Sequence, residues 1–251
     1  DGGLKYSRIA ISMSGTPDVG DGLAAIKKVV FEDKKITMAQ LIDALDSNFE
    51  GAEDIRKLLL AAPKFGNDDD YVDDIVNDVL MHGSKILTSM KGACGAKINC
   101  AAAAVTANVI FGYNVGATPD GRKAGEPISE GGISPHQGRN VSGPIATYRS
   151  VSKIDHTRLT NGSVLNMRFS PNALKDTTSM RKFSSMLRTF LETGGFFVQF
   201  NIVDTETLRA AQREPEKYRD LLVRVATYSA YFVELGENLQ NDIINRMEME
   251  I

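Results

Sequence analysis

The sequence predicts an α/β fold in which helices pack outside parallel or mixed strands. Residues 1–90 are mainly helical in pattern, residues 112–143 form a turn-rich stretch, and strands alternate with helices beyond it. In βαβ units a helix joins two parallel strands, so this alternation places strands in a sheet and helices on its outside. Hydrophobic residues make up 42% of the 251 residues, which is enough for a sizeable buried core.

Four helices are expected in the first part of the chain. Apolar residues recur at helical spacing over 21–31, and Thr37 and Gln40 then form a capping-box pattern before a second helix. A third helix is expected over 53–60, and a fourth from 71 to about 87. After residue 90, small and β-branched residues are mixed.

The stretch 112–143 is rich in glycine and proline and is too long for an ordinary connection. Loops of this length in a compact domain are generally functional or disordered. Its specific, non-repetitive sequence argues against a flexible linker. Beyond it the patterns predict, in order, a strand at 163–169, a helix at 179–192, a strand at 196–203, a helix at 205–212, a strand at 221–225 and a helix at 230–246.

Composition excludes several classes of protein. The formal net charge of −3 provides no basic field for nucleic acid or an anionic membrane surface. No stretch of about 18 apolar residues predicts a membrane span. The first residues, from Asp1 to Tyr6, carry neither a starting methionine nor a signal peptide, so we expect the chain to begin mid-protein. Cys94 and Cys100 fit buried, reduced thiols of a cytoplasmic protein.

Metal and phosphate sites are not predicted. The acidic run at 67–70 lacks the glycine and the distal glutamate of a calcium loop and fits a helix N-terminus instead. His82, His136 and His156 have no zinc or triad spacing, although His136 lies in the glycine-rich stretch and is the histidine to watch. The segment 116–125 has no phosphate-loop ending.

Two long segments carry a resemblance to a known family. The first reads GATPDGRKAGEP over 116–127 and continues with GISP at 132–135. The second reads YRDLLVRVATYSAYF over 218–232 and continues with QNDIINR at 240–246. Over nearly its whole length the chain resembles the C-terminal part of glycyl radical enzymes, the family related to pyruvate formate-lyase.

The resemblance implies a fold and an activity. Members of that family form a ten-stranded β/α barrel, so this chain would be the C-terminal portion of the barrel with its surrounding helices. Residues 1–115 would be the later part of the pyruvate formate-lyase-like barrel domain, and residues 116–251 the glycine radical domain. The implied reaction is radical cleavage or elimination of a C–C, C–O or C–S bond in a small oxygenated substrate, in anaerobic metabolism.

The resemblance also implies partners and a cofactor. No bound cofactor is expected, because the family stores a glycyl radical on the protein itself. An activating enzyme with an iron–sulfur cluster and S-adenosylmethionine installs it. The missing N-terminal half or a homologous chain would be a second partner, and full-length members are expected to be homodimers. Neither nucleic acid nor membrane is an expected partner.

The position of the radical glycine holds threonine in this chain. The family pattern Arg-Val-x-Gly-Tyr reads here Arg224-Val225-Ala226-Thr227-Tyr228, with Ser229 following. A glycine Cα radical flattens freely because no Cβ crowds it, and its backbone adopts angles that other residues resist. Threonine has one Cα hydrogen fewer and a stiff β-branched side chain. We therefore expect the chain as written to be unable to hold the radical.

Further site residues follow from the same pattern. Arg246, nineteen positions after Thr227, matches a family arginine that faces the active site, where it would pair with a carboxylate or an anionic substrate group. The alternative is a solvated arginine at a helix end. Arg224 is expected to form a buried pair that shapes the radical loop, together with Val225, Tyr228 and Ser229. Neither cysteine matches the family's Gly-Cys loop, so no thiyl cysteine is assigned.

Two other functions remain open at this stage. A radical-dead homologue could act as a non-catalytic binding partner of a full-length enzyme or of its activating enzyme. The small spare-part glycyl radical proteins fit badly, because they must supply the glycine that is replaced here. Part of a barrel exposes strand edges and apolar helix faces, so we expect the isolated chain to aggregate or to need a partner.

Overall fold

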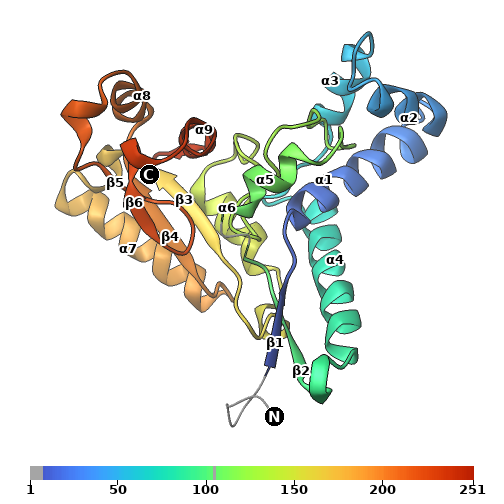
Figure 1. Cartoon of the computed structure of the whole chain (residues 1–251), viewed down its shortest axis with the longest axis horizontal. Helices are drawn as coiled ribbons and strands as arrows, with labels where there is room; N and C mark the ends of the chain where they lie inside the picture. The colour runs from blue at the N-terminus through green and yellow to red at the C-terminus, as the bar shows by residue number, and fades with distance from the viewer. Residues whose placement is uncertain (1–7, 104–105) are drawn as a thin grey trace.

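The computed structural model describes residues 8–103 and 106–251, apart from the side chain of Cys94. The expectation that rests on Asp1 to Tyr6 lies outside this part. Parallel strands with helices on one side dominate the architecture (Figure 1). β1 (Arg8–Ser12) pairs with β2 (Lys97–Ala101), and β3 (Leu165–Phe169) lies between β4 (Val198–Ile202) and β7 (Glu248–Met249).

The first part of the chain is helical, as predicted. α2 (Met38–Asp46) begins with the expected capping box of Thr37 and Gln40, and α3 (Glu53–Ala61) follows. α4 (Asp70–Ser89) is capped by Asp69, whose carboxylate accepts the Tyr71 N–H at 3.0 Å. The acidic run therefore forms a helix N-terminus, and Arg149 and Lys153 pair with it.

The first helix is longer than its apolar pattern predicts. α1 (Thr16–Ala25) begins five residues before the predicted helix and continues as a π-helix over Ile26–Glu32. Gly15 in the left-handed region and Pro17 in the first turn mark its start. Gly20 lets α1 pack closely on α4, because a Cβ there would lie 2.2 Å from Val76.

The second half follows the predicted alternation up to β5. β3 and β4 are parallel and joined by α7 (Thr177–Glu192), and α8 (Thr205–Arg213) precedes the short β5 (Leu222–Arg224). The predicted helix over 230–246 is wrong at its start. β6 (Ser229–Tyr231) pairs antiparallel with β5, a 3₁₀ turn follows, and α9 covers only Glu237–Asn245. Strand pairing with β5 outweighs the helical pattern there.

Other elements were not expected from the pattern. These are β1, β2, β7, α5 (Ala107–Tyr113) and α6 (Pro144–Ser152). Residues 114–143, here called the glycine-rich loop, contain neither helix nor strand, as predicted. Figure 1 shows this loop between the pair β1–β2 and the sheet of β3, β4 and β7, near the N-terminus of α1.

The strands have one apolar face and one polar face. Leu165, Met167 and Phe169 of β3 belong to the main core, where Phe169 packs edge-on against Phe183 of α7 at 5.2 Å. Because side chains alternate along a strand, Asn166 and Arg168 face the other way, as do Gln199 and Asn201 of β4. The face away from the helices is therefore polar and buried.

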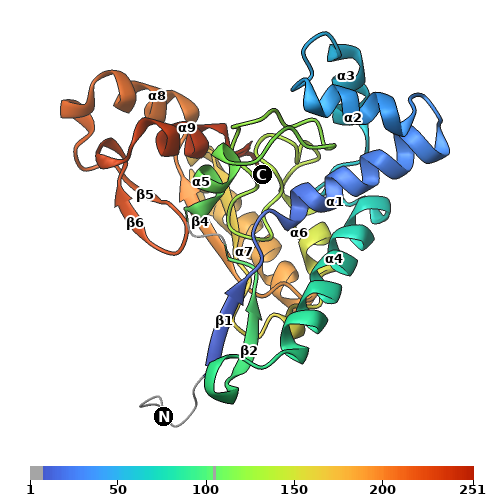
Figure 2. The ribbon, with the colours of Figure 1, turned by 45° about the vertical axis from the view of Figure 1, so that its right-hand side comes forward.

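A separate apolar core lies beneath β5 and β6. Val203, Leu208, Val223, Phe232 and Ile243 belong to it. Figure 2 shows α8 and α9 beside the two strands. Among the described residues, no helix is long and apolar enough to cross a membrane.

Candidate functional site

The C-terminal hairpin, residues 222–231, carries the position singled out in the sequence. The N–H of Val225 donates to the carbonyl of Tyr228 at 3.0 Å and closes the turn between β5 and β6. Val223, Val225 and Ala226 are buried, whereas Thr227, Tyr228 and Ser229 are exposed. The hairpin is thus anchored by its first strand and presents residue 227 at its tip.

Threonine fits the backbone of this tip without strain. The non-glycine residues in the left-handed region of the described chain are Lys34, Asn48, Phe49 and Asp68. Thr227 is not one of them, so its position does not demand a glycine conformation here. Threonine and glycine at this position therefore differ in their chemistry at Cα rather than in backbone strain.

Arg224 holds the hairpin to β4. The amide of Asn201 accepts the Arg224 N–H and donates to its carbonyl, both at 2.7 Å. The guanidinium donates to Gln199 Oε1, to the Thr227 carbonyl at 3.1 Å and to Ser229 Oγ at 3.3 Å. Arg224 is half-buried, and its hydrogen-bond partners among the described residues are neutral.

Arg246 joins the hairpin to the glycine-rich loop. It follows the last residue of α9 and is 6% exposed, so its interpretation as a solvated helix-end arginine is wrong. Its Nη2 donates to the Val225 carbonyl at 2.8 Å and to Asp242 Oδ2 at 3.1 Å, and lies 4.0 Å from Glu130 Oε2. Burial lowers the pKa of Arg246, but Glu130 and Asp242 outweigh this and raise it.

The two carboxylates around Arg246 lie in different environments. Burial raises the pKa of Glu130, against the opposing effects of Arg246 and Asn166. Asp242 accepts hydrogen bonds from Asn108 at 3.0 Å and from Gln137 at 2.6 Å. The loop, α5 and α9 therefore meet at one buried charged cluster behind the hairpin.

Arg168 is a site residue that the sequence analysis missed. It is buried in β3 and donates to the carbonyl of Ile244, in the last turn of α9, at 3.1 Å and to that of Arg246, just beyond the helix, at 2.6 Å. It also pairs with Glu248 at 3.0 Å. These bonds satisfy carbonyls that the end of a helix leaves without partners. The sequence did offer a signal for this residue, because an arginine stands within the segment LNMRF of the predicted strand.

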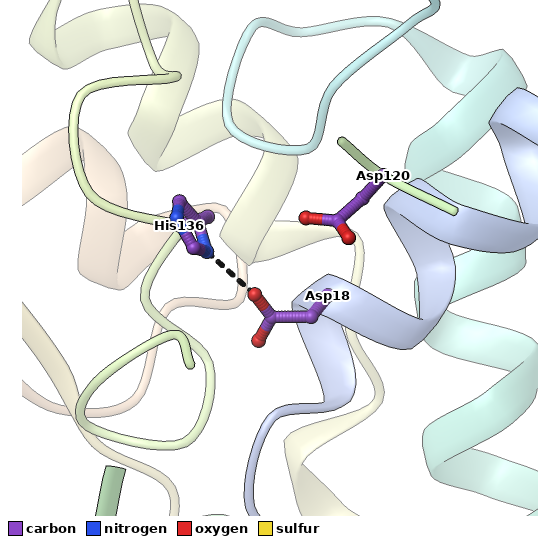
Figure 3. A group of neighbouring side chains, drawn as sticks. All are labelled: Asp18, Asp120 and His136. Atoms are coloured by element: carbon purple, nitrogen blue, oxygen red, sulfur yellow. Dashed lines mark hydrogen bonds and ion pairs between the residues drawn. The ribbon is translucent and has the colours of Figure 1, made fainter. Parts of the chain in front are cut away.

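A second buried network lies at the start of α1 (Figure 3). His136 Nδ1 lies 2.6 Å from Asp18 Oδ1, and the Ser129 N–H donates to Asp18 Oδ2 at 2.7 Å. Burial raises the pKa of Asp18, but its bonds to His136 and Ser129 lower it below the ordinary value. Asp120 lies beside this pair and could complete a three-residue metal site.

The donors around these carboxylates favour a structural role over a metal site. Arg139 pairs with Asp120 Oδ2, and Thr118 donates to Asp120 Oδ1. Each oxygen of Asp18 and Asp120 already faces a donor, and Arg139 supplies the positive charge that a cation would bring. The network therefore fastens the glycine-rich loop to α1.

Arg122 organises the glycine-rich loop from within. It is fully buried and donates to the carbonyls of Glu126 at 2.6 Å, Lys123 at 3.0 Å and Val115 at 3.3 Å, and also to that of Gly116. The motif GATPDGRKAGEP thus folds around its own arginine.

Cys100 is a buried thiol of β2, and burial raises its pKa, which fits the expected structural role. The side chain of Cys94 lies outside the described part.

Comparison with protein families places this fold and hairpin in a class. Residues 1–112 match the family model described as "Pyruvate formate lyase-like", and residues 129–233 match the one described as "Glycine radical". The chain belongs to the glycyl radical enzyme family and has part of its β/α barrel fold, as the sequence predicted.

The chain spans about a third of the length of the relatives that it matches. The chain is 46% identical over 92% of its length to the isethionate sulfite-lyase of Nitratidesulfovibrio vulgaris and covers 28% of that protein. It is 39% identical over 98% of its length to the trans-4-hydroxy-L-proline dehydratase of Clostridioides difficile, of which it covers 31%. The glycerol-bound B12-independent glycerol dehydratase of Clostridium butyricum superposes with a TM-score of 0.96 at 43% identity, over all of this chain and 32% of the dehydratase.

Proposed function

We propose that this chain supplies the hairpin-bearing part of a glycyl radical lyase or dehydratase that acts on a small oxygenated substrate, and that it cannot hold the radical as written. One observation carries the proposal. The hairpin and its supports are complete, yet Thr227 occupies the tip position where the family pattern has glycine. The division into a barrel part, residues 1–115, and a radical part, residues 116–251, belongs to the same proposal.

The loss follows from the structure of a Cα radical. Such a radical is stabilised when Cα is planar between the amide nitrogen and the carbonyl. The Cβ of threonine crowds that plane, and the β-branched side chain cannot turn away freely. Residue 227 is exposed in this chain, so the obstacle that we propose is the threonine side chain itself.

A partner that completes the barrel is part of the proposal. Among the described strands, β1 pairs only with β2, and none of its residues is fully buried. An unpaired strand edge is a ready template for another strand. The polar strand face that carries Asn166 and Gln199 would then line a closed interior suited to a small polar substrate. The names of the relatives favour lyase or dehydratase chemistry there. The buried thiol of Cys100 favours a cytoplasmic location.

The second candidate is a radical-dead homologue that binds a full-length enzyme or its activating enzyme. The unstrained backbone of Thr227 favours it, because the hairpin keeps its closed form without glycine. Such a chain would present the family's hairpin to a partner without reacting.

The test is to restore glycine at the tip. The wild-type chain and Thr227→Gly are treated anaerobically with an activating enzyme, S-adenosylmethionine and a reductant, and EPR spectra are recorded. A Cα-centred doublet is expected for Thr227→Gly alone. Thr227→Ser is the matched control, because it removes the branch but keeps Cβ, and it should stay silent. A doublet from the wild-type chain would overturn the proposed incompetence, and silence from all three would favour the binding partner.

A further inference from the structure

A small polar cavity lies behind the C-terminal hairpin. Its volume is about 20 Å³, and its walls include Glu130 and Gln137 of the glycine-rich loop, Asn166 of β3 and Arg246. Glu130, Asn166 and Arg246 are each more than nine-tenths buried. The cavity therefore lies inside the cluster that joins the loop to the hairpin.

Three of the lining side chains have one buried polar atom each without a hydrogen-bond partner among the described residues. These atoms are Asn166 Oδ1, Gln137 Oε1 and Arg246 Nε. Buried polar groups in proteins are nearly always satisfied, by protein or by ordered water. Three such atoms around one cavity point to a shared ligand.

Neighbouring contacts fix which of these atoms donate and which accept. The Asn166 amide nitrogen donates to Glu130, so its oxygen is the free acceptor. The Gln137 nitrogen donates to Asp242 at 2.6 Å and to the Ile128 carbonyl at 3.2 Å, which leaves its oxygen free. Both Nη atoms of Arg246 bond other groups, which leaves Nε as a free donor.

The ligand must therefore donate twice and accept once. An ammonium ion has no acceptor for Arg246, and a halide ion has no donors for the two amides. A cavity needs roughly 10–15 Å³ to hold one water molecule, so about 20 Å³ admits one and no larger solute. We infer that this cavity binds a single water molecule bonded to Asn166, Gln137 and Arg246.

This water has a positioning role for the hairpin. Arg246 Nη2 donates a hydrogen bond to the Val225 carbonyl at 2.8 Å. The water accepts a hydrogen bond from Nε of the same guanidinium and donates to Asn166 of β3 and Gln137 of the loop. The water thus links β3 and the glycine-rich loop to the arginine that bonds the hairpin. The inference does not depend on the residue at 227.

A crystal structure of the chain at about 1.5 Å resolution tests the site directly. One density peak is expected, at roughly 2.7–3.2 Å from each of the three atoms. A dry cavity, or a peak that contacts only one of them, would overturn the inference.

A double-mutant cycle tests the coupling in solution. Asn166 and Gln137 share no direct hydrogen bond, so Asn166→Leu and Gln137→Met should couple only through the common ligand and Arg246. The double variant should change the equilibrium constant of unfolding by about tenfold less than the product of the changes in the two single variants. Asn99→Leu, on the polar face of β2, is the control partner and should combine with Gln137→Met multiplicatively. Hydrogen exchange at the Val225 amide should quicken in each single variant, and additive effects with unchanged exchange would refute the positioning role.

Discussion

The glycine-rich loop and the C-terminal hairpin both lie around the same buried cluster, but they are held in different ways. The loop encloses two fully buried charged side chains, Asp120 and Arg122, and folds around their hydrogen bonds. The hairpin is anchored by the buried Val223, Val225 and Ala226 and by two arginines that mainly bond backbone carbonyls and amide side chains, while its tip is exposed. The loop depends on the identity of its side chains, whereas the hairpin depends mainly on its backbone.

This difference explains how threonine can stand at position 227 within an otherwise complete site. Arg224 and Arg246 bond the carbonyls of Thr227 and Val225, which any residue provides. A side-chain change at the exposed tip therefore leaves the anchoring bonds in place. A change at Arg122 would remove the donor from several loop carbonyls at once.

The largest expected effect is on the loop. Arg122→Met should lower the free energy of unfolding by about 3 kcal/mol, because it removes several hydrogen bonds from a buried charged group, each of which contributes about 1.5–3 kcal/mol. Denaturant unfolding of the chain, in the assembly state in which it is soluble, measures this. Arg219→Met, at a side chain 71% exposed, is the control and should change stability by less than about 0.5 kcal/mol. Equal losses of stability in Arg122→Met and Arg219→Met would contradict the special role of the buried arginine.

A pH-dependent effect should appear in the buried network beside the loop. Burial raises the pKa of Asp21 to about 8, against the attraction of Lys64 and Arg139. The unfolded chain releases this proton near pH 4 and the folded chain only near pH 8, so the contribution of Asp21 to stability falls as pH rises between these values. The slope is at most about 1.4 kcal/mol per pH unit.

Asp21→Asn isolates that contribution. The variant oxygen can still accept the Phe65 N–H, which bonds Asp21 at 2.7 Å. The stability of the wild-type chain relative to Asp21→Asn should therefore decline from pH 5 to pH 8, as urea unfolding at several pH values would measure. If the free energies of unfolding of the two proteins change in parallel with pH, the raised pKa of Asp21 is contradicted.

The smallest expected effect is on the hairpin. Arg224→Met removes bonds to the neutral partners Gln199, Thr227 and Ser229, of which the last two are exposed, so stability should fall by only about 1 kcal/mol. Hydrogen exchange should nevertheless quicken over residues 222–231 and stay unchanged in the loop. Arg209→Met on α8 serves as the control, and faster exchange in both regions would show that hairpin and loop are one cooperative unit.

Local patterns predicted most of the helices correctly. Thr37 and Gln40 form their capping box, and the 3.6-residue spacing located α2, α3, α4, α7 and α8. The pattern failed over 230–236, at the start of the predicted helix, because pairing of β6 with β5 depends on a strand that precedes it rather than on its own spacing. β1 was missed because its partner, β2, lies about 90 residues further along the chain.

The sequence by itself determined most of the helices, the irregular course of the glycine-rich loop, the family resemblance and the threonine at position 227, because each depends on residues that are neighbours in the chain. Only the tertiary structure decided that Arg246 is buried, that Arg168 satisfies the end of α9, and that Asp18 and His136 form a pair. These partners are separated by many residues, and whether a charged side chain is solvated or paired depends on what the folded chain packs against it.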